Sequence, residues 1–106
     1  MIEQTIELKL FIAGDIGTAG ATIRRYCKDI GLCVTLTPTE YIYSGGAEHG
    51  MIIGFINYPR FPDTLDGLTA KATNLGHILL SELGQWSFSL VGPKETLYYS
   101  VRDKNE

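Results

Sequence analysis

The spacing of hydrophobic residues changes along this chain, and each change marks a predicted element. From Thr5 to Ile12, apolar side chains alternate with other residues, which is typical of a strand with one buried face. Helical spacing follows. We expect that helix to begin at Thr18, as the N-cap, and to end at Gly31, which suits the left-handed position after a last turn.

The middle of the chain predicts two further strands. Residues Cys33–Tyr43 are rich in Val, Thr and Tyr, and Pro38 within them cannot donate to a sheet ladder, so this strand is expected at an edge or to bulge there. A turn at Ser44–Gly46 leads to a strand over Met51–Tyr58.

A second helix is predicted from an N-cap at Asp63 to Gly84, with an apolar stripe at three- and four-residue spacing. Strands over Ser87–Val91 and Thr96–Val101 complete the pattern, and residues 103–106 are expected to fray.

The order β-α-β-β-α-β plus one strand predicts an α+β fold of the ferredoxin-like type. We expect one domain over residues 1–106, with an antiparallel sheet, both helices on one face and an extra C-terminal strand. Right-handed crossovers are expected to place the first and third strands side by side at the centre, running parallel.

Composition narrows the function classes. Hydrophobic residues make up 44% of the chain, charged residues 20%, and the net charge is −3, which disfavours nucleic acid as a partner. The two cysteines, Cys27 and Cys33, form neither a C-x-x-C pair nor a zinc motif, and we interpret them as buried thiols in a reducing compartment. Neither a signal peptide nor a membrane span is recognisable, so a cytoplasmic location is expected.

One face of the sheet is expected to carry an interface. The third strand carries apolar side chains on both of its faces, and we expect Ile52 and Ile56 on the face away from the helices. Tyr41 and Tyr43 on the neighbouring strand add aromatic area. An exposed apolar patch of this kind usually marks an interaction surface, so we predict a homo-oligomer packed through the sheet. The alternative is that the extra strand and the tyrosines cover this face locally.

If the two central strands run parallel, both strand-to-helix junctions meet at one edge of the sheet. Helix N-termini attract anions, so we predict a site for a small anionic ligand, such as a nucleotide, at that corner. Its residues would be Gly14, Gly17, Thr18, Tyr58, Arg60 and Phe61.

A structural interpretation of the same residues stays open. The glycine spacing matches neither the dinucleotide fingerprint nor a P-loop, and Asp15 would repel an anion. Arg60 would then simply pair with Asp63 or Asp66 as a surface ion pair.

Catalytic signals are sparse. His49 lies in a glycine-rich turn and His77 on the second helix, each without a recognisable partner, and no nucleophile elbow is present. We therefore predict no catalytic residues, no metal and no cofactor, and favour a binding protein over an enzyme.

Two resemblances extend this interpretation. Residues 32–38, followed by Tyr41–Tyr43 and a glycine turn, resemble the CutA family, which implies a ferredoxin-like fold and trimers formed through the sheets. The family's tryptophan after the tyrosine and its later His-Pro-Tyr are missing, so its metal binding is not carried over. Residues 56–62 resemble small bacteriophage proteins, which implies a role against host defences in the host cytoplasm.

The leading hypothesis from sequence is thus a non-enzymatic, oligomeric protein that sequesters a small anionic, nucleotide-like ligand. One alternative is a module that binds and inhibits a host protein through the tyrosine-rich face. Another is a small isomerase or tautomerase that uses His49 or a tyrosine as proton carrier.

Overall fold

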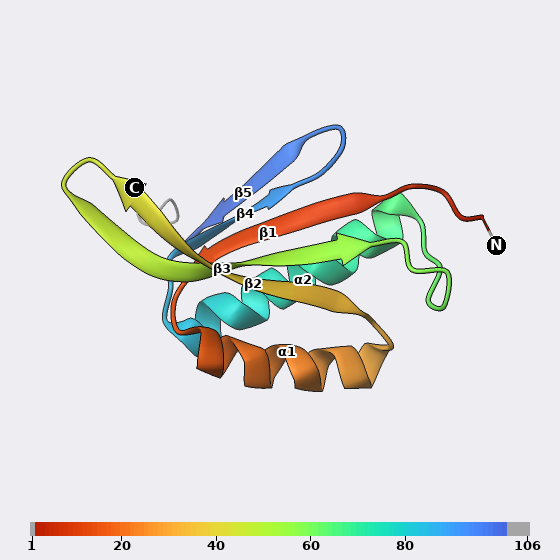
Figure 1. Ribbon diagram of the computed structural model, residues 1–106, viewed down its shortest axis with the longest axis horizontal. Coiled ribbons are helices and arrows are strands. Elements are labelled where there is room, and N and C mark those ends of the chain that lie inside the picture. Colours follow the sequence, from red (N-terminus) through yellow and green to blue (C-terminus); the bar gives the residue numbers. More distant parts are fainter. Residues whose placement is uncertain (1, 102–106) are drawn as a thin grey trace.

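The computed structural model describes residues 2–101, which form one five-stranded antiparallel sheet and two helices. The predicted tail at residues 103–106 lies outside the described residues. The elements are β1 (Glu7–Ala13), α1 (Ile16–Ile30), β2 (Val34–Tyr43), β3 (Gly46–Ile56), α2 (Leu65–Leu83), β4 (Ser87–Val91) and β5 (Thr96–Ser100). Their sheet order is β2-β3-β1-β4-β5 (Figure 1).

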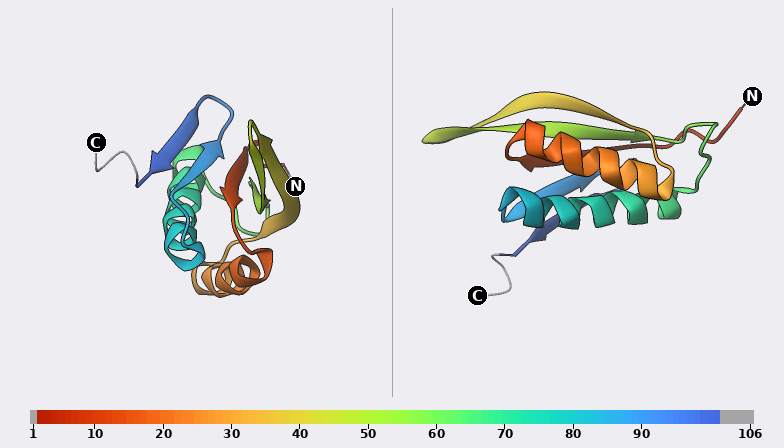
Figure 2. Two further views of the ribbon diagram at one scale, coloured as in Figure 1. Left: turned by 90° about the vertical axis from the view of Figure 1, so that its left-hand side faces the viewer. Right: turned by 90° about the horizontal axis from the view of Figure 1, so that it is seen from below.

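The predicted fold class is confirmed: the order is ferredoxin-like, and β5 extends the sheet beyond β4. Both helices lie side by side on one face of the sheet (Figure 2). β2 is an edge strand, as Pro38 predicts. Neither helix of residues 2–101 is long and apolar enough to cross a membrane.

The predicted direction of the central strands is wrong. β1 and β3 pair antiparallel, from Glu7 opposite Ile56 to Ala13 opposite Gly50. The reason is topological: α1 returns the chain so that β2 runs parallel to β1, and the hairpin then reverses β3. The end of β1 and the end of β3 therefore lie at opposite rims of the sheet.

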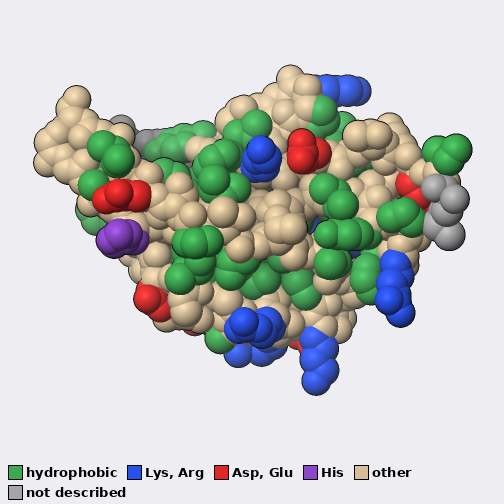
Figure 3. Space-filling view, viewed as in Figure 1, with side chains coloured by type: hydrophobic (Ala, Val, Ile, Leu, Met, Phe, Trp, Pro, Cys, Tyr) green, Lys and Arg blue, Asp and Glu red, His purple; other side chains and the backbone are tan. Residues whose placement is uncertain are grey.

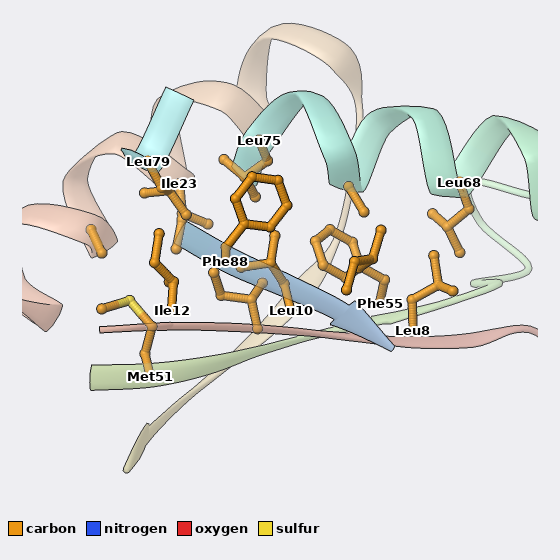
Figure 4. Close-up of a cluster of buried hydrophobic side chains, with 14 of the residues drawn as sticks. Leu8, Leu10, Ile12, Ile23, Met51, Phe55, Leu68, Leu75, Leu79 and Phe88 are labelled. Carbon is orange, nitrogen blue, oxygen red and sulfur yellow. The ribbon is translucent and has the colours of Figure 1, made fainter. Parts of the chain in front are cut away.

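The core lies between the sheet and the helices, and Figure 4 shows its side chains meeting there. Alternate side chains of β1 are buried, as predicted, and the apolar stripe of α2 packs against them. Leu65, at the start of that stripe, is only partly buried. In α1, Ile23 is buried, whereas Ile30 at the helix end is 38% exposed. The fully buried side chains from the sheet and helices include Leu8, Leu10, Ile12, Met51, Ile53, Phe55, Leu68, Leu75, Leu79, Phe88 and Leu90.

Both predicted N-caps shift by a few residues. Asp15, not Thr18, caps α1, and its Oδ2 accepts hydrogen bonds from the Thr18 backbone N–H (2.8 Å) and hydroxyl (2.9 Å). Thr64, not Asp63, caps α2 and accepts from the Gly67 N–H at 3.0 Å. Each true cap side chain accepts from the N–H three residues later, which is the favoured capping geometry.

Asp63 instead lies one residue before the N-cap of α2 and contacts the start of the helix with its side chain. Its carboxylate accepts from the Thr64 N–H at 2.7 Å and pairs with the Lys71 ammonium at 2.7 Å. The hydrogen bond from Lys71 is the main cause that lowers the pKa of Asp63, and the Thr64 N–H adds to it, while partial burial opposes both. The charged carboxylate is thus the form that the fold favours.

The Gly76→Ala variant is expected to lose about 1–3 kcal/mol of unfolding free energy. A Cβ at Gly76 would lie 2.4 Å from Phe88 ring carbons, so α2 and β4 would have to move apart. Urea denaturation measures the loss. Ser81→Ala on an exposed position of the same helix is the control. A Gly76→Ala protein as stable as that control would contradict the close packing of α2 on β4.

The Asp63→Asn variant is expected to be less stable at pH 7 by less than about 1 kcal/mol, since the ion pair is partly exposed. Because the pKa of Asp63 is lowered on folding, its contribution is complete above the unfolded pKa and disappears as pH falls through the folded pKa. The two proteins should therefore converge in strongly acidic solution. Urea midpoints measured from pH 2 to pH 7 test this, and a gap that persists at the acidic end would refute it.

Candidate functional site

The six residues predicted to form one ligand corner lie at two separate rims. Gly14, Gly17 and Thr18 lie where β1 ends and α1 begins, which we call the α1 rim. Tyr58, Arg60 and Phe61 follow β3 at the opposite end, which we call the α2 rim and which also includes the β4–β5 turn at residues 92–95. The antiparallel pairing of β1 and β3 separates the two groups, so the joint corner does not exist.

At the α1 rim, the protein's own carboxylate occupies the helix N-terminus. Asp15 accepts from the Thr18 N–H and hydroxyl, and these bonds, with one from the Gly17 N–H, lower the pKa of Asp15 against a small opposing effect of burial. A fixed negative charge is therefore already placed where an anion would bind. Gly14 packs on the other side against Leu83, at the end of α2.

At the α2 rim, Asn57 fastens the connection between β3 and α2. It is 8% exposed, its side-chain amide donates to the Gln4 carbonyl at 2.8 Å, and its Oδ1 accepts from the Asp63 N–H at 2.8 Å. One buried side chain thus ties the segment before β1 to the start of α2. Sequence reasoning missed this role, because an Asn between a strand and a proline also fits an ordinary turn.

The remaining residues of this connection point to different neighbours. Phe61 lies over Gly31 at the end of α1, and Tyr58 lies against Cys33, which raises the pKa of the Tyr58 phenol. Arg60 is exposed, and among residues 2–101 its guanidinium pairs with neither Asp63 nor Asp66. The predicted surface ion pair of Arg60 is therefore not formed among these residues, and its predicted role in ligand binding stays a prediction.

A cavity of 180 Å³ opens beside this connection, between the first turns of α2 and the β4–β5 turn. Its walls are apolar where they touch the core, and its mouth is charged. The lining residues are Leu8, Leu65, Asp66, Thr69, Leu90, Gly92, Pro93, Lys94, Glu95 and Leu97. An apolar interior with a few polar groups at the entrance is the usual composition of a small-molecule site.

The sequence contained a partial signal for this cavity. Asp66 falls in the first turn of the predicted second helix, and Gly92–Pro93, between the last two predicted strands, is a typical turn pair. Nothing in the spacing showed that the two lie together. Their proximity comes from the antiparallel packing of β4 against β1, which brings the end of β4 to the start of β1 and α2.

The face of the sheet away from the helices carries the four predicted interface residues. Strand register places Tyr41, Tyr43, Ile52 and Ile56 on this face, where Phe11 pairs with Ile52. Tyr41 is half-buried, and its hydroxyl donates to the Met51 carbonyl at 2.6 Å, whereas Tyr43 is 53% exposed and Ile56 is 42% exposed. Figure 3 shows hydrophobic side chains gathered over the middle of this face.

A second hollow lies on that same face, lined by Thr5, Glu7, Lys9, Val91, Gly92 and Pro93. It shares Gly92 and Pro93 with the cavity, so the β4–β5 turn separates the two hollows. Whatever packs on the open face near Val91 therefore lies next to the mouth of the cavity.

The two histidines lie away from this rim. His49 is exposed near the start of β3, opposite Glu40, on the part of the β2–β3 hairpin that extends beyond β1 (Figure 1). His77 lies on α2 with its ring edge-on to Phe88 (5.3 Å between centroids) and Tyr99 (4.9 Å). Among residues 2–101, no three His, Cys, Asp or Glu side chains are grouped so as to hold a metal ion.

Two solved structures are similar to this chain over nearly its whole length. A phage SAM lyase in its apo state matches with a TM-score of 0.75 at 15% identity, covering 95% of this chain and 96% of that one. A phage SAM lyase in complex with S-methyl-5'-thioadenosine matches with a TM-score of 0.70 at 15% identity, covering 96% and 94%. No protein-family model and no curated protein sequence matches the chain.

These neighbours correct the functional prediction from sequence. Both are enzymes that act on S-adenosylmethionine (SAM), so the preference for a non-enzymatic protein is wrong, and its sequestering role is withdrawn. Both come from phages, which agrees with the resemblance to small phage proteins. Neither is a CutA protein, and the CutA resemblance gains no support. At this level of identity, the similarity establishes the shared fold.

Proposed function

We propose that this chain is an enzyme that cleaves SAM or a closely related sulfonium nucleoside by lyase chemistry. The observation that carries the proposal is the match of 95% and 96% of the chain to two phage SAM lyase structures, one of them holding S-methyl-5'-thioadenosine. The small nucleoside in that complex also fits the nucleotide-like ligand predicted from sequence. We further propose that the chain is of phage origin and acts in the host cytoplasm.

The reaction needs little from the protein beyond binding and orientation. S-Methyl-5'-thioadenosine remains when SAM loses the bond between its sulfonium sulfur and the γ-carbon of the aminobutyrate group. The electron pair of that bond passes to sulfur, and an oxygen of the substrate's own carboxylate forms a new bond to the γ-carbon, giving a lactone. No water, oxidant or outside base is consumed, so the atoms and charges balance within the substrate.

The cavity at the α2 rim suits this chemistry. The sulfonium and the attacking carboxylate neutralise each other as the bond breaks, and a wall of low polarity favours a transition state that is less charged than the ground state. The leucines of the cavity supply such a wall. Asp66 and Glu95 outnumber Lys94 in the cavity lining, and this net negative charge attracts a substrate of net positive charge. A carboxylate there also suits the ribose hydroxyls.

The cavity in one chain is small for the whole substrate. Its 180 Å³ is below the roughly 300 Å³ at which ligand sites of drug-like molecules begin. A second copy packed on the open face would border the turn at Gly92–Pro93 and extend the mouth. This is why we retain the homo-oligomer predicted from Tyr41, Tyr43, Ile52 and Ile56 as part of the proposal.

We also retain a role against host defences as part of this proposal. An enzyme that consumes SAM removes the methyl donor of the host, so any host defence that needs SAM would be weakened. In this proposal the protein destroys the small molecule, whereas the hypothesis from sequence was that it only sequesters it.

Purified protein incubated with SAM is expected to produce S-methyl-5'-thioadenosine, separated and quantified by liquid chromatography against a protein-free blank. Asp66→Asn is expected to lower kcat/KM by about tenfold, equivalent to about 1.4 kcal/mol of transition-state binding. Glu40→Gln, an exposed carboxylate on the β2–β3 hairpin far from the α2 rim, is the matched control and should keep full activity.

Two results would count against this proposal. Folded wild-type protein that forms no more thioadenosine than the blank would remove the enzymatic function. Activity that survives Asp66→Asn and falls with Glu40→Gln would place the site elsewhere.

The oligomer has its own test. Light scattering coupled to size-exclusion chromatography is expected to show more than one copy for the wild type, and a single copy for Ile52→Glu, because a charge at the centre of the open face would have to be buried. Ile30→Glu, at an exposed position on the end of α1, is the control and should stay oligomeric. A monomeric wild type at micromolar concentration would contradict the predicted interface.

A further inference from the structure

The cavity at the α2 rim is lined by three charged side chains, one of which is a cation. Asp66 belongs to the first turn of α2, and Lys94 and Glu95 belong to the β4–β5 turn on the other side of the mouth. Within the part of the chain that the structure describes, the Lys94 ammonium forms no ion pair with either carboxylate. The cation at the mouth is therefore free to bind an anionic group of a ligand.

The backbone of the β4–β5 turn fixes the place of Lys94 at the mouth. The Gly92 N–H donates to the Glu95 carbonyl at 2.9 Å, so Pro93 and Lys94 form a tight two-residue loop. The proline ring restricts φ at the first of these two positions. Gly92 packs closely against the cavity wall, since a Cβ there would lie 3.1 Å from a methyl carbon of Leu8. The lysine thus extends from a fixed point, while its exposed side chain can turn toward a ligand.

The charges in the lining complement those of the proposed substrate in number and sign. SAM carries two cations, the sulfonium and the α-ammonium, and one anion, the carboxylate of its aminobutyrate group. The lining carries two carboxylates and one ammonium. Complementary charges give specificity and fix the orientation of a ligand more than they add raw affinity. The two carboxylates suit the cationic groups of the substrate, and Lys94 is the lining residue whose charge suits its carboxylate.

We propose that Lys94 binds the substrate carboxylate and so selects sulfonium nucleosides that carry an amino-acid group, an assignment that rests on the proposed function. A lysine ammonium is a compact charge with three N–H donors and no acceptor, which matches a carboxylate that only accepts. Contact with one carboxylate oxygen leaves the other oxygen able to attack the γ-carbon. The lysine makes and breaks no covalent bond, so the balance of the reaction is unchanged.

Lys94 is expected to affect substrate binding more than the rate of bond cleavage. As the carboxylate oxygen bonds to the γ-carbon, its negative charge is lost and its attraction to the ammonium falls. The lysine therefore stabilises the bound substrate at least as much as the transition state. Loss of an interaction of this kind raises KM and changes kcat little.

The experiment compares two thioether nucleosides by isothermal titration calorimetry with the full chain. S-Adenosylhomocysteine keeps the amino-acid group, and S-methyl-5'-thioadenosine lacks it. Lys94→Met removes the charge and keeps an unbranched side chain, and it should weaken binding of S-adenosylhomocysteine about tenfold while leaving that of S-methyl-5'-thioadenosine unchanged. With SAM as substrate, the variant should show a KM about tenfold higher and a kcat within about threefold of the wild type.

The control variant is Lys28→Met, which removes an exposed lysine in the last turn of α1 outside the cavity lining and should bind both nucleosides like the wild type. Circular dichroism establishes that both variants are folded. A Lys94→Met protein that keeps both affinities, or loses both equally, would overturn the role of Lys94, and so would a wild type that binds neither nucleoside. Failure of the lyase function alone gives a different result: Lys94→Met discriminates between the nucleosides as expected, but the wild type does not cleave SAM.

Discussion

The antiparallel pairing of β1 with β3 is the constraint on which the rest of this molecule depends. Seven consecutive residues of β1 pair with β3 at the centre of the sheet, and one face of both strands is buried against the helices. This pairing fixes opposite rims for the two strand-to-helix junctions. The antiparallel pairing of β4 on the other side of β1 aligns the end of β4 with the start of β1, and so builds the cavity at the α2 rim.

The functional features follow from how this sheet is covered. On the helix side, apolar residues from every strand meet the helices, and the cavity lies where the first turns of α2 leave the core partly open. On the other side, hydrophobic residues remain exposed over the central strands (Figure 3). The β4–β5 turn touches both regions. A substrate site in the cavity and a second copy on the open face would therefore share the border at Gly92–Pro93.

Most elements of the fold were predictable because their signals are local. The alternation in β1, the apolar stripe of α2, the glycines that end both helices and the edge position of Pro38 each depend on neighbours within a few residues. The N-caps were missed by one to three residues, because Asp, Thr and Ser compete for the same position and differ little in preference. Gly76 gave no signal of its close contact with Phe88, which is distant in sequence.

The sequence by itself determined the elements, their order and a chain with two apolar sheet faces, since periodicity and turn chemistry are properties of short segments. Only the tertiary structure decided which segments became neighbours. It separated Arg60 from Thr18, joined Asp66 to the β4–β5 turn, and placed Cys27 and Cys33 in the lining of one groove. The physical reason is that strand direction and register are set by pairing across the whole sheet, and a single reversal moves a junction to the opposite rim.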